Sequence, residues 1–169
     1  RDPWLSRLDR EQDNVRAAIE PTSEEQTLSA SIDWSYALLP SPEQELFTRL
    51  SVFTGGWTLE AAEAVCAGDG IPRDAVVELL VRLVDKSMVT SDEQPDGTAR
   101  YRLLETLQQY GRELLEAHGL AAALQQRRAA WCLTLVEEAE PHLIGPGRDP
   151  WLSRLDREQD NVRAALAWA

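Results

Sequence analysis

Five basic residues in the middle of the chain have positions that could serve nucleic-acid recognition. Three lie on one predicted helix and two on the returning strand of a predicted β-hairpin: Arg73, Arg82, Lys86, Arg100 and Arg102. Arginine and lysine in such positions bind phosphates, and arginine also hydrogen-bonds to guanine in the major groove. These residues would make the contacts if the chain bound DNA.

The helix that carries the first three is predicted over residues 73–87. Its apolar side chains recur at three- and four-residue steps, so one broad face is buried. The β-prone segments 88–90 and 101–103 flank Asp96-Gly97, which predicts a hairpin because glycine tolerates the positive φ of a tight turn. The apolar side chains of the helix are Val76, Val77, Leu79, Leu80, Leu83 and Val84.

Cap and stop signals predict further helices on both sides of this unit. Residues 41–44 are predicted to form a capping box with Pro42 at the first helical position, and Gly55-Gly56 to end that helix. Thr58 is predicted to cap a short helix that runs to Cys66. The fold is therefore predicted to be mainly α: a winged helix-turn-helix with one small β-hairpin, followed by an α-helical hairpin. The later helices are expected over 104–118, 121–140 and from Asp149 onward.

The charge balance argues against DNA binding. The chain has 29 acidic and 17 basic residues and a formal net charge of −12. Residues 28–104, which include all five candidate contacts, contain twelve acidic and six basic residues. A phosphate-binding surface needs the opposite sign. We therefore expect no DNA binding by this fragment.

Residues 1–18 are identical to residues 148–165. One perfect copy favours an engineered or very recent duplication, because an old repeat array would show degenerate similarity at a regular period. Each copy is predicted to begin a helix with Asp-Pro. The predicted organisation is a duplicated helix over 1–20, a linker over 21–26, a winged helix over 27–104, and a helical arm with the start of a helical repeat over 105–169.

Both copies present a narrow, heptad-like apolar stripe with one polar position, which suits pairing with a single partner helix. If one copy fills its own groove, the other leaves an apolar stripe that favours self-association. The sequence therefore predicts an oligomer. The pairing residues are Trp4, Leu5, Leu8, Gln12, Val15 and Ile19 in the first copy, and Trp151, Leu152, Leu155, Gln159, Val162 and Leu166 in the second.

Four segments carry a family resemblance: TLSASIDWSYALLPSPEQELFTRLSVFTGGWTLEAAEAVC, LVRLVDKSMV, RYRLLETLQQYGREL and DREQDNVRAALAWA. Together they resemble the winged-helix and arm region of bacterial STAND-class signal-transduction ATPases, the LuxR-type or antibiotic-regulatory-type transcriptional regulators. The resemblance covers roughly residues 27–169. It implies a winged helix between a nucleotide-binding domain and a helical sensor of tetratricopeptide-like repeats. It also implies that DNA binding belongs to a separate module.

The resemblance also suggests where a nucleotide would be sensed. Related animal and plant proteins place the histidine of a Met-His-Asp motif against the nucleotide, and the alignment puts Leu104 at that histidine and Glu105 at the aspartate. Leucine cannot donate a hydrogen bond to a phosphate, so Arg102 is the nearest substitute. The chain has no G-x-x-x-x-G-K-[ST] loop, and we expect no ATPase activity from it.

The remaining reactive residue types predict no catalytic site. His118 and His142 are isolated, so we assign no metal and no cofactor. No nucleophile elbow or carboxylate pair is present, and Cys66 and Cys132 are expected to be buried, reduced thiols. No apolar run approaches the ~20 residues of a membrane span, and no secretory signal is present. We expect a cytoplasmic protein.

The sequence thus favours a non-catalytic regulatory module that couples a nucleotide-binding domain to a helical sensor of the same parent protein. Two alternatives stay open. One is a DNA-binding winged-helix transcription factor domain that uses the five basic residues. The other is an engineered self-assembling protein built on this domain, for which the duplicated segment is the evidence.

Overall fold

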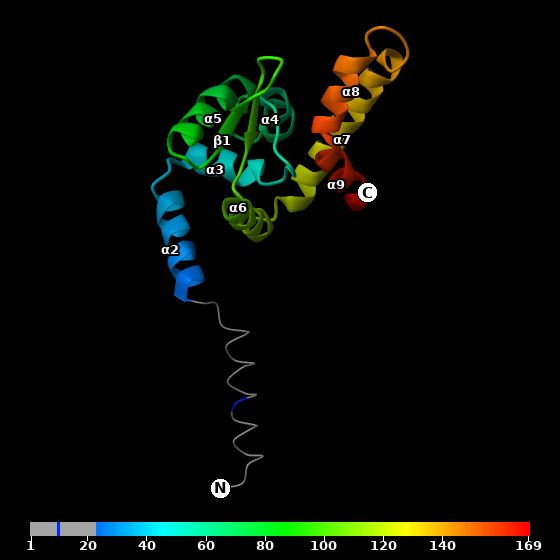
Figure 1. Ribbon diagram of the computed structural model, residues 1–169. Helices are drawn as coiled ribbons and strands as arrows, with labels where there is room; N and C mark the ends of the chain where they lie inside the picture. The colour runs from blue at the N-terminus through cyan, green and yellow to red at the C-terminus, as the bar shows by residue number, and fades with distance from the viewer. Residues whose placement is uncertain (1–9, 11–22) are drawn as a thin grey trace. The chain divides into compact units, whose positions relative to one another are not determined.

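The structure is a computed structural model that describes Arg10 and residues 23–169 (Figure 1). The chain divides into two compact units, Arg1–Leu39 and Pro40–Ala169, and each is considered by itself. The first unit contains helix α2, Ser23–Ala37, which includes residues 23–26 of the predicted linker and has no buried side chain. The predicted helix over 1–20, apart from Arg10, lies outside the described residues, and so do residues 21–22 of the predicted linker.

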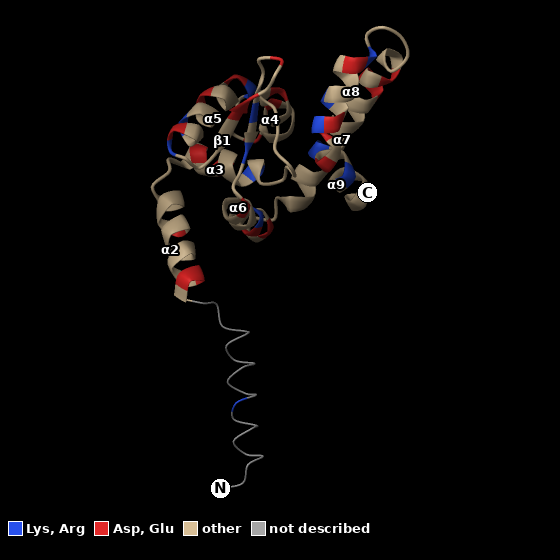
Figure 2. Cartoon of the chain, in the orientation of Figure 1, with Lys and Arg blue, Asp and Glu red and all other residues tan. Residues whose placement is uncertain are grey.

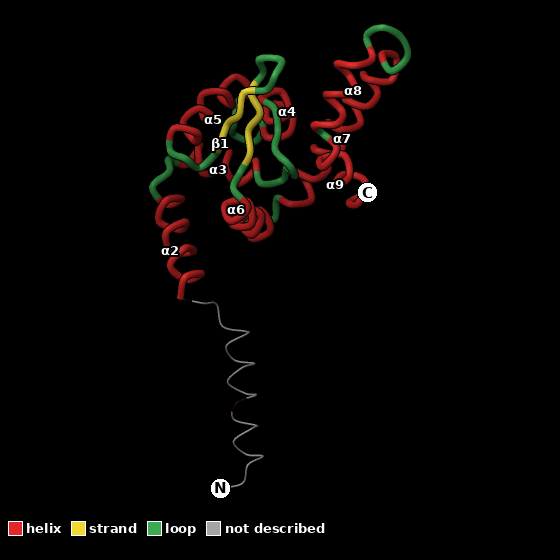
Figure 3. The backbone as a smooth tube through the Cα atoms, viewed as in Figure 1, coloured by secondary structure: helices red, strands yellow, loops and turns green. Residues whose placement is uncertain are grey.

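The second unit begins with the predicted winged helix (Figure 3). Strands β1 and β2 are antiparallel, with Thr90 opposite Arg102 and Glu93 opposite Ala99. The predicted buried face of α5 is confirmed at Leu80 and Leu83, which are almost inaccessible to solvent, as are Leu46 and Phe47 on α3. Val77 was predicted on the same face and is instead exposed, because it points to the opposite side of α5. The elements are α3 (Ser41–Leu50), α4 (Leu59–Cys66), η1 (Arg73–Ala75), α5 (Val76–Asp85), β1 (Thr90–Glu93), β2 (Ala99–Arg102) and α6 (Glu105–Ala117).

Two predictions about helix ends need correction. Ser41 is already helical and Pro40 precedes the helix, so the predicted capping box is absent. The Gln44 amide instead donates to the Pro40 carbonyl at 3.0 Å, which satisfies the donor that the box would have capped. Helix α3 also ends at Leu50, before Gly55-Gly56. The Thr58 cap of α4 is confirmed, because its hydroxyl accepts from the Ala61 amide at 3.2 Å.

The hairpin is confirmed, but both strands lie closer to its turn than predicted. Met88 and Val89 are core residues that precede β1. The other edge of β2 is occupied, because Trp57 and Tyr101 exchange two backbone hydrogen bonds of 2.8 Å. Gly56 permits this approach: its φ is +92°, and a Cβ there would lie 2.6 Å from the Tyr101 carbonyl oxygen.

The helical arm follows α6 (Figure 1). The second copy was predicted as one helix capped by Asp149, and both points are wrong. Gly147 precedes the helix, and Glu158 (φ −95°, ψ 5°) separates two helices. The break occurs where polar side chains turn inward to meet the winged helix. The elements of the arm are α7 (Ala121–Ala139), η2 (Glu140–His142), α8 (Arg148–Arg157) and α9 (Gln159–Trp168).

Both cysteines are buried, unpaired thiols, as predicted. Burial raises the pKa of Cys66 to about 12 and that of Cys132 to about 11, from an ordinary value of 9.0. Only the thiolate is nucleophilic, so we expect neither thiol of the native chain to react with a disulfide reagent at pH 8. Both should react after denaturation. Stoichiometric labelling of the native protein would contradict this.

The same shifts predict a dependence of stability on pH. The unfolded chain loses its thiol protons above pH 9, whereas the folded chain retains them to a higher pH. The contribution of the two thiols to the free energy of unfolding is therefore complete below pH 9 and is lost as the pH rises towards 12.

Among the described residues, no helix is long and apolar enough to cross a membrane.

Candidate functional site

Three of the five basic residues proposed for DNA contact lie on or beside α5, and each already pairs with a carboxylate. Arg73 lies 3.3 Å from Glu63 of α4. Arg82 lies 2.5 Å from Glu78, one helical turn earlier. Lys86 donates to Glu43 of α3 at 2.5 Å, and this carboxylate is buried. The cations of the predicted reading helix are therefore neutralised by the chain itself.

The outward face of α5 is acidic and apolar between these pairs. Val77 and Val81, four residues apart, are exposed large apolar side chains. Asp74 and Asp85 are exposed on the same segment, and so is Glu78, which pairs with Arg82. Figure 2 shows acidic residues along α5. A mixed apolar and acidic face is suited to a protein partner and unsuited to phosphates.

The two wing arginines behave differently from each other. Arg102 pairs with Asp92 of the neighbouring strand at 3.5 Å, and both side chains are mostly exposed. Arg100 turns towards the arm, where its side chain is only 13% exposed and lies 2.7 Å from the Glu158 carboxylate. It also donates to the Arg157 carbonyl at 2.8 Å. Arg100 is therefore a structural link between β2 and the arm.

Glu158 and Asn161 complete a buried polar cluster at the α8–α9 break. The Asn161 amide nitrogen donates to Glu158 and to the Gly56 carbonyl, both at 2.9 Å. Its oxygen accepts from the Thr54 amide at 2.7 Å. All the polar atoms of this amide that face the winged helix are thus satisfied, as buried polar groups require. We name Arg100, Glu158 and Asn161 the latch cluster.

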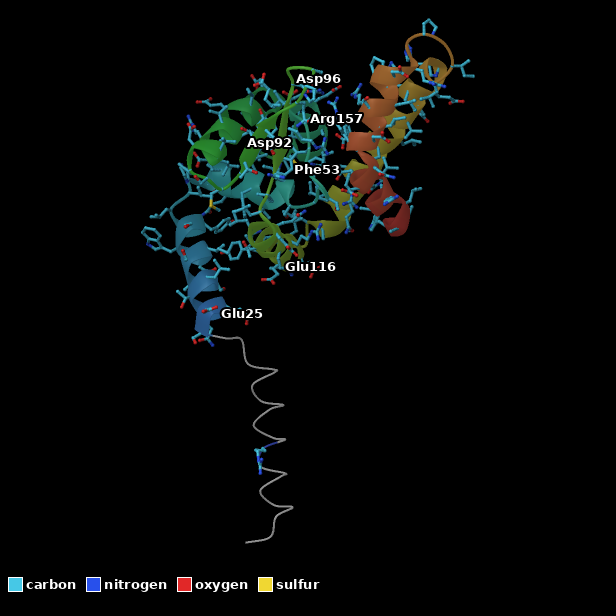
Figure 4. All side chains as sticks on the ribbon, in the orientation of Figure 1. Glu25, Phe53, Asp92, Asp96, Glu116 and Arg157 are labelled. Carbon is cyan, nitrogen blue, oxygen red and sulfur yellow. The ribbon has the colours of Figure 1, made fainter. Side chains whose placement is uncertain are left out.

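Two exposed ion pairs flank the latch cluster. Arg154 of α8 lies 3.1 Å from Glu60 of α4, and Arg157 lies 2.9 Å from Asp96 at the tip of the hairpin (Figure 4). Hydrogen bonds from Thr98 and then from Arg157 hold the pKa of Asp96 well below its ordinary value. The tip of the wing, which would approach DNA phosphates in the alternative function, is therefore attached to the arm.

The three residues proposed for nucleotide sensing lie together where β2 leads into α6. Arg102 is the last residue of β2, Leu104 precedes the first turn of α6, and Glu105 begins it. Leu104 and Glu105 are exposed. The three are accessible to a neighbouring domain, and their role stays a prediction.

The predicted helix-pairing residues divide into two sets. Those of the first copy lie outside the described residues: Trp4, Leu5, Leu8, Gln12, Val15 and Ile19. In the second copy, Trp151, Leu155 and Val162 are half-buried, whereas Leu152, Gln159 and Leu166 are exposed. The residues of this copy that turn fully inward are Glu158, Asn161 and Ala165. Because the helix breaks at Glu158, the predicted residues form no single continuous stripe.

The latch cluster and one aromatic contact of the arm could not be recognised from residue types alone. Glu158 and Asn161 lie three residues apart in a charged segment, DREQDN, which has the composition of a solvated helix face. His142 stacks on Trp151, with ring centroids 4.8 Å apart. Within the part of the chain that the structure describes, no three His, Cys, Asp or Glu side chains are grouped so that they could hold a metal ion.

Comparisons with known proteins identify the central unit. Residues 39–116 match the family described as winged helix-turn-helix domain. The Mycobacterium tuberculosis protein named "Putative HTH-type transcriptional regulator Rv0890c" is 41% identical over 155 residues, which are 92% of this chain and 17% of the relative. The M. tuberculosis "Uncharacterized protein Rv0894" is 43% identical over 104 residues, 61% of this chain and 26% of that protein.

The chain thus spans about a sixth of the length of the longer relative that it matches. No solved structure matches it. The sequence match and the observed order of three helices, a hairpin and a closing helix agree with each other. Residues 39–116 therefore form a winged helix-turn-helix domain, in a chain that is similar over most of its length to proteins named as HTH-type transcriptional regulators.

Proposed function

We propose that this chain is a non-catalytic regulatory module whose winged helix contacts other protein domains in place of DNA. The observation that carries the proposal is the pairing of all five candidate DNA contacts with carboxylates of the chain itself. The acidic and apolar face of α5 supports it. So does the attachment of the wing tip to the arm through Arg157 and Asp96.

A more specific form of the proposal follows from the resemblance to STAND-class regulators. There the winged helix would couple a nucleotide-binding domain to a helical sensor, and both would lie outside this chain. The fold suits such coupling, because the latch cluster joins β2 and the Gly56 carbonyl to the arm at the break between its last two helices, α8 and α9. The exposed start of α6 at Leu104 and Glu105 would face the nucleotide-binding domain.

DNA binding is the second candidate, and the family match and the names of the longer relatives favour it. Exposed ion pairs contribute only about 0–1 kcal/mol, so Arg73, Arg82 and Arg102 could exchange their carboxylates for phosphates at small cost. Arg100 could not do so without separation of the arm from β2, because its side chain is buried against Glu158.

Fluorescence anisotropy with duplex DNA distinguishes these candidates. We expect no binding at micromolar protein concentration and physiological salt. A DNA-binding surface would give an affinity that falls by roughly 0.9 log unit per phosphate contact for each tenfold rise in salt. Micromolar binding that is lost in an Arg73→Ala/Arg82→Ala variant, and retained in an Arg148→Ala control on α8, would establish DNA binding and contradict our proposal.

We also propose self-association through the duplicated segment. Two identical segments in one chain offer the same side chains to the same partner surface. We expect sedimentation to show an oligomer whose share rises with concentration, and we expect deletion of residues 1–22 to leave a folded monomer. A full-length chain that stays monomeric at high micromolar concentration would refute this proposal. Mass measurement of the natural parent gene product tests whether the duplication was engineered.

A further inference from the structure

A pocket of about 510 Å³ lies where the winged helix meets the arm. Its walls come from the segment after α3, from α6 and α7, and from the last turns of α9. Arg112 of α6 and Arg128 of α7 provide its positive charge, and Ala164 and Trp168 of α9 provide an apolar wall. Half of the residues that line it are polar or charged: Ser51, Thr54, Arg112, Glu116, Gln125 and Arg128. A concave site with convergent charged groups at a junction of two substructures is a candidate site for a small molecule.

Arg128 is the unusual residue of this pocket. It is 5% exposed, and one terminal nitrogen donates to the Val52 carbonyl at 2.5 Å. Its Nε–H is buried and has no hydrogen-bond partner. Among the described residues, no carboxylate lies within ion-pair distance of this guanidinium. Burial lowers the pKa of Arg128, and the nearby positive charge of Arg112 acts in the same direction, against an opposing effect of Cys132.

Arg112 adds a second cation that no carboxylate of the described chain neutralises. Its guanidinium makes only long contacts, 3.4 Å to the Ser51 carbonyl and 3.3 Å to the Thr54 hydroxyl. Glu116 follows on α6, where Figure 4 labels it, and lines the pocket without an ion pair to either arginine. Two guanidinium groups beside one cavity, one of them almost fully buried, are energetically unfavourable unless an anion joins them.

We propose that this pocket binds a small organic carboxylate. The carboxylate would lie between the guanidinium groups of Arg112 and Arg128, which donate charge-assisted hydrogen bonds in a planar arrangement suited to it. The apolar body of the ligand would pack against Trp168 and Ala164. A ligand in this position contacts the winged helix and the arm together, and so strengthens their association. This site is independent of the DNA-binding question.

Benzoate and benzamide are suitable probes because they share a shape and differ in charge. We expect benzoate to raise the melting temperature of the full chain in a concentration-dependent manner, because it binds only the folded state. We expect it also to shift the NMR signal of the Arg128 Nε–H group. The affinity for benzamide should be lower than that for benzoate by roughly tenfold or more, since benzamide lacks the charge-assisted hydrogen bonds.

Matched variants locate the site. Arg112→Gln should weaken benzoate binding roughly tenfold or more. Arg127→Gln is the control, because the neighbouring Arg127 pairs with Asp69 and donates to the Ala67 carbonyl, away from this pocket. Arg112 is preferred to Arg128 for the test, since Arg128 also holds the Val52 carbonyl and its loss could unfold the chain. Any one of three results would overturn the proposal. They are equal effects of benzoate and benzamide on the melting temperature, no shift of the Arg128 Nε–H signal, and a loss of benzoate affinity in Arg127→Gln as large as that in Arg112→Gln.

Discussion

Replacement of Arg100 by alanine is expected to lower the free energy of unfolding by about 3–5 kcal/mol, the cost of removing one partner of a buried ion pair. The change would leave the Glu158 carboxylate, whose side chain is 3% exposed, without its cation. It would also remove the donor to the Arg157 carbonyl. Urea denaturation measures this effect as a lower transition midpoint.

Arg102→Ala is the matched control, because Arg102 lies two residues away on the same strand. Its side chain is 62% exposed and pairs with an exposed carboxylate, so its loss should cost less than about 1 kcal/mol. Hydrogen exchange should also respond to Arg100→Ala at the Thr54 amide, which donates to Asn161 in the latch cluster. Equal stability of the two variants would mean that the latch cluster contributes nothing to the association of the arm.

Leu83→Ala is expected to lower the free energy of unfolding by about 2–5 kcal/mol. Leu83 of α5 is fully buried, and α5 packs against α3 and α4. The substitution removes apolar contacts and leaves a cavity that the surrounding helices can fill only in part. Thermal or urea denaturation would measure the loss.

The control for this prediction is Val81→Ala on the same helix. Val81 is 49% exposed, so truncation there should change the stability by about 0.5 kcal/mol or less. A loss under about 1 kcal/mol for Leu83→Ala would indicate that α5 presents a different face to the core. A large loss for Val81→Ala would indicate that the outward face of α5 is covered by another part of the protein.

The elements of the winged helix could be predicted because each leaves a local signal. The apolar spacing of α5 and the Asp96-Gly97 turn depend on residues close together in the sequence, and the structure bears out both. Helix ends were less predictable. The Gln44 amide found a backbone acceptor at Pro40, so the side chains of the expected capping box had no remaining role.

The contacts between the winged helix and the arm could not be predicted in this way. Arg100 and Glu158 are 58 residues apart, and each lies in a charged segment whose composition indicates a solvated surface. Their burial depends on how α8 and α9 approach β2, which neither periodicity nor propensity specifies. The sequence also does not indicate that Arg128 lacks an ion-pair partner, because any of several glutamates could have paired with it.

The pairing of Trp57 with Tyr101 has a consequence for aggregation. It occupies one side of β2, and β1 covers the other, so only the outer edge of β1 is open among the described strands. An open edge can add strands from other molecules. Here it is only four residues long and it carries two carboxylates, Glu93 and Asp92, of which Asp92 pairs with Arg102. The shortness and the acidic character of this edge therefore disfavour the addition of strands from other copies.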